Sequence, residues 1–197
     1  MYLIAGLGNP GIEYAGTRHN AGFLVADQLA ASLDAKFHAG KGEFWLAECS
    51  LKNVEITILK PVTYMNNSGI AVQEFLERQQ IALENILIVC DDFQLPMGTI
   101  RLRKEGSDSG HNGLSSVIYH LQTDQFARLR CGIASGSMPS EKSKMKDFVL
   151  DRFPESELRI VENMVERARE ACTSFIMDGI DQAMNRFNAK PSEELFI

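Results

Sequence analysis

The chain has 197 residues, of which 45% are hydrophobic and 23% charged, and its formal net charge is −6. A chain of this size and composition can bury one sizeable core, so we expect a single domain over residues 1–190 and a frayed tail over residues 191–197. It contains no apolar run of about 18 residues, which excludes a membrane-spanning helix. It also lacks the basic and apolar start of a signal peptide, so we expect a cytoplasmic protein.

The charge is unevenly distributed along the chain. Residues 98–146 contain eight basic and four acidic side chains, so this segment carries +4 and the remainder −10. Salt screens distant charges beyond about 8–10 Å, so a basic face can attract phosphate groups even on an acidic protein. Composition therefore leaves two interpretations open, a phosphate-binding face or ordinary solvated surface.

Hydrophobic spacing predicts alternating strands and helices in the first part of the chain. Residues 1–5 form a short apolar run that ends at glycines, which is typical of a buried strand. Residues 21–33 carry apolar side chains at helical spacing, and Asn20 is a candidate N-cap for this helix. Residues 43–50 and 54–59 are predicted to be two strands joined by a Lys-Asn turn, which makes a hairpin.

The same alternation continues through the middle of the chain. Residues 68–79 and 114–121 have the spacing of helices, and residues 86–90 and 129–133 are short apolar runs typical of buried strands. Residues 99–103 alternate apolar and basic side chains, as a half-exposed strand does.

The last part of the chain is predicted to be helical. Residues 134–143 are rich in Gly, Ser and Pro and are expected to form a loop or mobile lid. Pro154 then begins a long amphipathic helix to about Met177, and a short helix follows to Asn188. Because strands and helices interleave throughout, we expect a single-domain α/β sandwich with a central mixed β-sheet flanked by helices.

Four polar segments lie in turns beside these apolar runs. They are Gly6–Gly11 followed by residues 18–20, then residues 63–66, residues 91–92 and residues 110–113. Loops held by a rigid scaffold are where catalytic and binding groups usually lie. These segments supply one candidate base, one carboxylate and several amides, which suits proton transfer and the binding of a neutral polar group.

The first segment matches the Gly-x-Gly-x-x-Gly fingerprint of dinucleotide-binding proteins, but its context does not fit. The loop does not open directly into a helix, and the nearest acidic residue at the required distance, Asp27, lies inside the predicted helix. Glycines at a sharp turn, where another backbone segment comes close, explain the loop better. We therefore predict no cofactor.

His19 and Asp91 follow two predicted strands and form the candidate catalytic pair. Ligands of α/β sheets gather beyond the carboxyl ends of strands, so these two side chains are expected to meet there. A buried carboxylate that accepts a hydrogen bond from one imidazole nitrogen leaves the other nitrogen as a base. The chain has no HExxH motif, cysteine cluster or GxSxG motif, so we predict no metal and no covalent acyl-enzyme, with water as the nucleophile.

The segments GLGNPG…Y…TRHNAG, KPVTYMNNSG, DD-x-x-LP-x-G and GHNGL occur in this order and, taken together, resemble bacterial-type peptidyl-tRNA hydrolases. The resemblance extends from Met1 to about Asn188. It implies a monomeric, metal-independent esterase with an α/β fold built on a mixed sheet. It also implies that the substrate is peptidyl-tRNA, bound through its acceptor stem and CCA end. The ester between the peptide and the 3′-terminal ribose would be hydrolysed, which releases tRNA for reuse.

The resemblance also implies roles for individual residues. His19 would be the general base, Asp91 its stabilising partner, and Asn9 the residue that reads the peptide end. Four further residues would contact the acceptor end of the tRNA: Tyr14, Tyr64, Asn66 and Asn112. The candidate phosphate contacts are Arg101, Arg103, Lys104, Lys142, Lys144 and Lys146.

Some residues depart from the pattern of this family. Residues 107–109 (Ser-Asp-Ser) replace a stretch that is commonly Gly-rich, and Asp108 adds negative charge beside the expected phosphate site. Cys90 and Gln94 replace a His and an acidic residue that are common there. The alternative interpretation is a non-catalytic RNA-binding or splicing homologue of the same fold. Retention of His19 and Asp91 favours the hydrolase.

Overall fold

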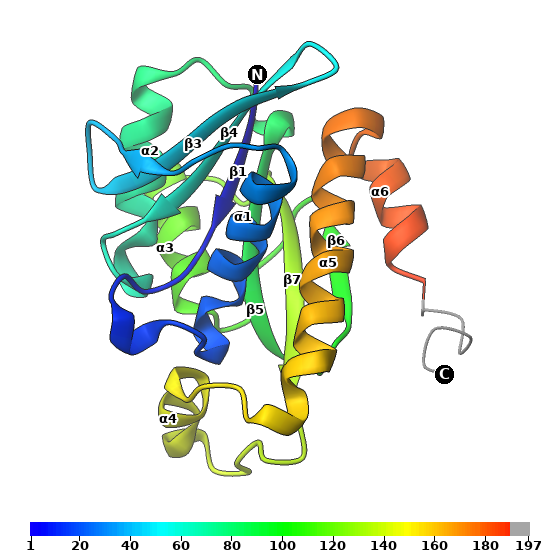
Figure 1. Ribbon diagram of the computed structural model, residues 1–197. Helices are drawn as coiled ribbons and strands as arrows, with labels where there is room; N and C mark the ends of the chain where they lie inside the picture. Colours follow the sequence, from blue (N-terminus) through cyan, green and yellow to red (C-terminus); the bar gives the residue numbers. More distant parts are fainter. Residues whose placement is uncertain (190–197) are drawn as a thin grey trace.

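The computed structural model describes residues 1–189, apart from the side chain of Lys142, and builds a seven-stranded sheet (Figure 1). The tail expected over residues 191–197 lies outside the described residues. In spatial order the sheet runs β2-β3-β4-β1-β5-β7-β6. The strands are β1 (Tyr2–Gly6), β2 (His38–Ala39), β3 (Phe44–Leu51), β4 (Val54–Pro61), β5 (Ile86–Pro96), β6 (Ile100–Arg103) and β7 (Ala127–Ala134).

The sheet is mixed, as the sequence predicts. Strand β1 is parallel to β4 and β5, and β5 is parallel to β7, whereas β3 pairs with β4 as an antiparallel hairpin. Strands β2 and β6 close the two edges in antiparallel pairing. The carboxyl ends of β1, β4, β5 and β7 therefore point to one edge of the sheet, and the loops that follow them meet there.

Helices cover both faces of the sheet, which confirms the predicted sandwich. Helices α1, α5 and α6 lie on one face and α2 and α3 on the other, while the short α4 lies beyond the strand ends (Figure 1). None of the helices among the described residues combines the length and apolar character needed to cross a membrane. The helices are α1 (Ala21–Ser32), α2 (Ser68–Arg78), α3 (Asn112–Leu121), α4 (Met145–Leu150), α5 (Glu155–Asp178) and α6 (Ile180–Phe187).

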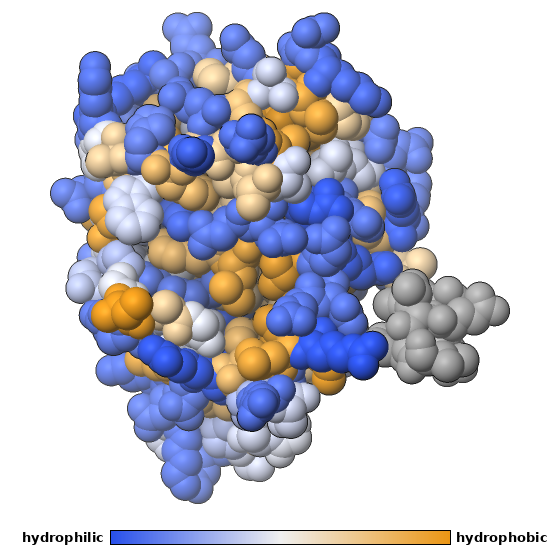
Figure 2. All heavy atoms as spheres, viewed as in Figure 1, coloured by the Kyte–Doolittle hydropathy of each residue, from blue (hydrophilic) through white to orange (hydrophobic). Residues whose placement is uncertain are grey.

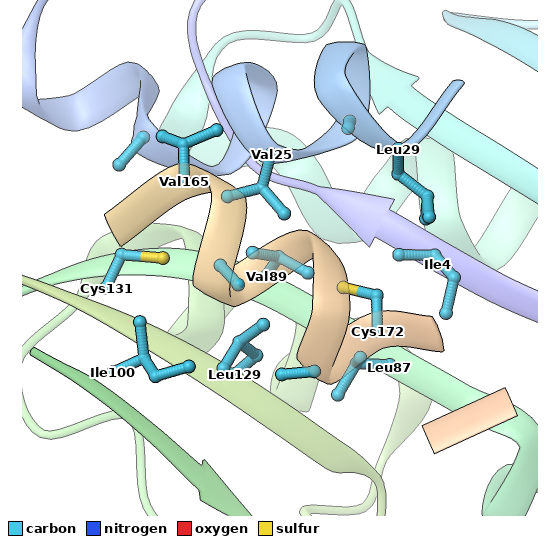
Figure 3. Close-up of a cluster of buried hydrophobic side chains, with 14 of the residues drawn as sticks. Ile4, Val25, Leu29, Leu87, Val89, Ile100, Leu129, Cys131, Val165 and Cys172 are labelled. Atoms are coloured by element: carbon cyan, nitrogen blue, oxygen red, sulfur yellow. The ribbon is translucent and has the colours of Figure 1, made fainter. Parts of the chain in front are cut away.

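The core forms two layers because neighbouring residues of a strand point to opposite faces. In β1, Leu3 packs against α2 and α3, whereas Ile4 packs towards α1 and α5, and β5 alternates in the same way. Figure 3 shows the layer under α1 and α5, where residues such as Val25 and Val165 meet the central strands. Burial of each such side chain stabilises the fold by about 1.5–3 kcal/mol. The outer surface of this face is mostly hydrophilic (Figure 2), as expected for amphipathic helices.

The cysteines are free thiols, and three of the four are buried. Cys131 and Cys172 lie in the core layer of Figure 3. Burial raises the pKa of Cys172 to about 12. Because the thiolate is the reactive form, this thiol is inert at neutral pH.

Three local features differ from the sequence prediction. Strand β5 does not end at Cys90 but continues to Pro96, with an irregular register after Asp92. The two acidic residues fit inside the sheet because each has a cationic or hydrogen-bonding partner. Helix α4 was not predicted, since six residues are too few to show a period. Asn20 precedes α1 as expected, but its side chain does not cap the helix.

Candidate active site

A cleft of about 500 Å³ opens at the carboxyl ends of the parallel strands. It brings together all seven residues that the sequence singled out as catalytic or substrate-binding, and one of the predicted phosphate contacts, Lys146. Helix α4 supplies one wall. The lining residues are Asn9, Tyr14, His19, Tyr64, Met65, Asn66, Asp91, Phe93, Gly110, His111, Asn112, Met145, Lys146, Val149 and Leu150.

Close packing of β1 against the start of α1 places His19 at this cleft. A Cβ atom on Gly6 would lie 2.3 Å from the carbonyl oxygen of Gly22, and one on Gly22 would lie 2.4 Å from that of Val89. Only glycine permits this approach. Two 3₁₀ turns, at Ile12–Tyr14 and Arg18–Asn20, separate the strand from the helix. The glycines therefore serve backbone packing, as the sequence predicts.

His19 and Asp91 are in direct contact, as the sequence predicts. The Nδ1 atom of His19 lies 2.8 Å from Oδ1 of Asp91, and the two side chains are 12% and 1% exposed. Because the carboxylate can only accept, Nδ1 of His19 carries the proton. The Nε2 atom of His19 is then the nitrogen with a free lone pair, which is the requirement for a base.

The electrostatic balance keeps Asp91 ionised and makes His19 more basic. Burial by itself lowers the pKa of His19, but the charge and the hydrogen bond of Asp91 outweigh it and raise the pKa above its ordinary value. Burial would raise the pKa of Asp91, but the adjacent His19 and His111 hold it well below its usual range. The pair is therefore an anionic carboxylate beside an imidazole that can take up a proton.

His111, which the sequence analysis did not select, is a second histidine in contact with Asp91. Its Nε2 atom lies 2.9 Å from Oδ1 of Asp91, the same oxygen that His19 contacts. Its Nδ1 atom accepts a hydrogen bond from the backbone N–H of Leu114 at 3.1 Å, so His111 is the N-cap of α3. The available signal was its place between Gly110 and the start of a helix. A buried Asp91 also needs more than one donor.

Asn9 also lines the cleft and is held by several hydrogen bonds. Its Oδ1 atom accepts from the backbone N–H of Met65 at 2.8 Å, so its Nδ2 group is left as a donor. The side chain of Asn20 bonds to both backbone groups of Asn9, at 2.8 and 2.9 Å. Asn20 is the N-cap residue of α1, as predicted, but its side chain fixes the Asn9 loop, which uses both of its polar atoms, and does not bond to the helix.

Tyr14 and Tyr64 form an aromatic pair at the mouth of the cleft. Their ring centroids are 6.2 Å apart in an edge-to-face arrangement, and Tyr64 is 53% exposed. The backbone of Tyr64 has φ 58° and ψ 159°, a conformation that residues with side chains rarely adopt and that costs about 1–3 kcal/mol. Asn66 and Asn112 are exposed close by, in the 3₁₀ turn at Met65–Asn67 and at the start of α3. With this backbone conformation, Tyr64 lines the cleft with an exposed ring.

A second cavity of about 320 Å³ lies beside strands β5, β6 and β7. It is lined by the predicted phosphate contacts Arg101 and Arg103, together with Arg130, which the sequence analysis counted only as part of the basic segment. The Nη1 atom of Arg130 lies 3.1 Å from Oδ2 of Asp92. Since Asp91 lines the first cavity and Asp92 the second, the basic cavity begins one residue from the candidate catalytic pair.

The other predicted phosphate contacts are spread more widely. Lys104 lies 3.6 Å from Asp181 on α6, and Lys144 lies 2.9 Å from Glu141. The Lys142 side chain is outside the described part of the structure. The structure therefore brings Arg101 and Arg103 together in one cavity and Lys146 into the other, but it does not gather all six.

The α4 wall is fastened to the histidine loop by Arg18, another residue that the sequence analysis did not select. Its guanidinium donates to the carbonyl of Arg152 at 3.0 Å, pairs with Glu157 at 3.2 Å and lies 4.5 Å from the ring centre of Phe148. Arg18 is only 4% exposed. The residue next to His19 thus holds the start of α5 and the wall of the cleft.

The histidines and the carboxylate could also be considered as metal ligands. One ligand atom from each of His19, Asp91 and His111 lies within 4.8 Å of the others. An ion among them would replace both imidazole protons that bond to Asp91. In the hydrogen-bonded arrangement, each imidazole instead donates one proton to the carboxylate.

The fold and the cleft define a class of α/β-sandwich hydrolases in which a carboxylate-bound imidazole is available as a base and amides surround it. The family model for peptidyl-tRNA hydrolase matches residues 3–194. The chain belongs to the peptidyl-tRNA hydrolase family, whose members are ester hydrolases.

Individual relatives agree with this assignment over nearly the whole chain. The peptidyl-tRNA hydrolase of Chlorobaculum parvum is 45% identical over 188 residues, which cover 95% of this chain and 98% of that protein. That of Finegoldia magna is 40% identical over 190 residues, 96% of this chain and 98% of that protein. A crystal structure of peptidyl-tRNA hydrolase from Acinetobacter baumannii has a TM-score of 0.90 at 37% identity, covering 96% and 95% of the two chains.

Proposed function

We propose that the cleft hydrolyses the ester between a peptide, or an N-blocked aminoacyl group, and the 3′-terminal ribose of tRNA. The observation that carries the proposal is the contact of His19 with an ionised, buried Asp91, which leaves Nε2 of His19 as a base. His19 takes a proton from water as the water oxygen bonds to the ester carbonyl carbon. The protonated His19 then returns a proton to the departing ribose oxygen, which yields a free peptide carboxyl group and free tRNA.

The amides around the cleft position the reacting groups in this proposal. The Nδ2 group of Asn9 donates to the peptide next to the ester, which favours a blocked amino group over a free one. Asn66 and Asn112 hold the attacking water and donate to the oxygen of the ester carbonyl as it becomes negative. Donors of this kind are worth about 10²–10³ in rate in other enzymes.

The aromatic pair and the basic residues bind the tRNA in this proposal. Tyr64 offers an exposed ring, and Tyr14 a partly exposed one, to the terminal base, and stacking of one base on an aromatic ring contributes about 1–3 kcal/mol. Arg101 and Arg103, with Arg130 behind them, form a cationic cavity for a phosphate group of the acceptor stem. Of the lysines, Lys146 is the best placed, since it lines the cleft itself.

The proposal includes the physical state of the enzyme. One catalytic domain spans residues 1–190 and acts as a monomer in the cytoplasm. Support comes from the two continuous core layers around a single sheet and from a cleft built by one chain.

The test is hydrolysis of an N-acetyl-aminoacyl-tRNA, followed by the release of free tRNA. We expect the wild-type chain to turn over this substrate and His19→Ala to lose turnover while its circular dichroism spectrum and tRNA affinity stay unchanged. Normal cleavage by His19→Ala would remove this histidine from the mechanism. Binding of tRNA without cleavage by the wild-type chain would favour the non-catalytic RNA-binding alternative.

A further inference from the structure

The carboxylate of Asp91 receives two imidazole donors on a single oxygen. The Nδ1 atom of His19 and the Nε2 atom of His111 lie 2.8 and 2.9 Å from Oδ1, and the two rings are 5.1 Å apart at their centres. The other oxygen, Oδ2, is buried without a hydrogen-bond partner among the described residues. The two histidines therefore share one acceptor, so a hydrogen bond from one of them changes how strongly the oxygen attracts the proton of the other.

The tautomer of His111 is fixed from the opposite side of its ring. The backbone N–H of Leu114 donates to Nδ1 of His111, so this nitrogen carries no proton and Nε2 must be the donor to Asp91. Leu114 lies in the first turn of α3, and its N–H is one of the four that a helix leaves unpaired. The start of α3 thus leaves Nε2 of His111 as the donor to Asp91.

We propose that His111 is a positioning residue that lowers the affinity of His19 for a proton, because it donates a second hydrogen bond to the Asp91 oxygen that His19 uses. A donor to the charged carboxylate offsets part of the negative charge that attracts a proton to His19. The base then remains unprotonated, and hence active, to a lower pH. This inference rests on the proposed role of His19 as the general base.

Asp91 increases the proton affinity of His19, and His111 is the group within hydrogen-bond distance of Asp91 that can reduce this effect. Asp92, the neighbour of Asp91, is paired with Arg130, and Arg18 is paired with Glu157. The ionisable groups that line the cleft with His19 are Asp91 from β5, His111 before α3, Lys146 on α4, and Tyr14 and Tyr64 at the mouth.

Two substitutions separate the role of His111 towards Asp91 from its role as a helix cap. His111→Asn retains an oxygen near the position of Nδ1, where it can accept from Leu114, but it is too short to donate to Asp91. His111→Gln retains a donor near the position of Nε2 but loses the cap. If His111 were only a cap, the Gln variant would be the more damaged of the two in every respect.

The experiment is the pH dependence of kcat/KM for the full chain with N-acetyl-aminoacyl-tRNA. The acid limb of this profile is the rise in kcat/KM as His19 loses its proton. Hydrogen bonds to a charged group are worth about one to two pKa units, so His111→Asn should move the acid limb to a pH about one unit higher. Activity then falls about tenfold at pH values below the limb and recovers on the alkaline plateau. His111→Gln should keep the wild-type limb and unfold at a lower temperature. His120→Asn, at a histidine of the same helix that bonds to Gln73, is the matched control and should leave the limb unchanged.

A titration of the His19 imidazole by NMR in the substrate-free chain gives a second readout that does not require activity. We expect the same upward shift in His111→Asn. An unmoved limb and an unmoved titration in His111→Asn, or an equal shift in His111→Gln, would overturn the inference. If His19→Ala retained activity, the proposed function would fail, while the titration would still decide whether His111 controls the proton affinity of His19.

Discussion

Replacement of Asp91 by Asn removes one charge from the centre of the site with little change in shape. In the Asp91→Asn variant, the amide oxygen can take the place of Oδ1 and accept from both imidazoles, as the carboxylate does. The amide nitrogen then takes the place of Oδ2, which has no hydrogen-bond partner among the described residues. The tautomer of His19 is therefore retained, and the variant tests the charge rather than the geometry.

The expected effect follows from the sign of the interaction. The charge of Asp91 raises the pKa of His19, whereas burial lowers it, so without the charge the pKa falls below its ordinary value. A hydrogen bond to a charged group contributes about 1.5–3 kcal/mol, which equals about one to two pKa units. We expect the acid limb of kcat/KM to move down by that amount. On the alkaline plateau, loss of the same stabilisation of the protonated His19 lowers the rate by about 10- to 150-fold.

The assay is hydrolysis of N-acetyl-aminoacyl-tRNA from about pH 4.5 to 9, a range chosen to span about two units on either side of the ordinary histidine pKa. The matched control is Asp92→Asn, which makes the same charge change one residue away, at a side chain that pairs with Arg130. It should raise KM and leave the acid limb in place. An acid limb that stays in place or moves up in Asp91→Asn would refute the electrostatic reasoning.

Three further predictions address binding and stability. Arg103→Gln should weaken tRNA binding and reduce the slope of log KM against log salt by about one, as measured in a salt series, with kcat unchanged; an unchanged slope would remove Arg103 from the phosphate contacts. Gly22→Ala should destabilise the fold by about 1–3 kcal/mol in urea unfolding, because its Cβ would meet the carbonyl of Val89; a wild-type midpoint would contradict the packing argument. Arg18→Gln leaves the half-buried Glu157 without its cation, so trypsin should cleave the α4 segment faster; cleavage at the wild-type rate would show that Arg18 does not hold this wall.

The sequence predicts the sheet and the contact within the candidate catalytic pair because both depend on simple periodic rules. Alternation of side chains identifies the strands, and parallel strands bring their carboxyl ends together. The contact between His19 and Asp91, 72 positions apart in the chain, follows from those rules. The resemblance to a known family added the amides and tyrosines, which all line the same cleft.

What the sequence does not reveal depends on tertiary contacts of single side chains. Asn20 has the residue type of a helix cap, but the Asn9 backbone offers it two hydrogen bonds instead of one. His111 has only one local signal, its place between Gly110 and the start of a helix, and its partner lies 20 residues away on β5. Arg18 has the residue type of a surface charge, whereas its guanidinium lies between Phe148 and Glu157. Such contacts are specified by the assembled fold.

The position of Arg18 immediately before His19 has a consequence for the cleft. Arg18, whose guanidinium holds the α4 wall, and His19 are consecutive residues joined by one peptide bond. The buried guanidinium of Arg18 also donates to the carbonyl of Asp151 at 3.4 Å, so the contacts that hold the α4 wall belong to the neighbour of the candidate base, and a movement of this wall would strain the loop that carries His19.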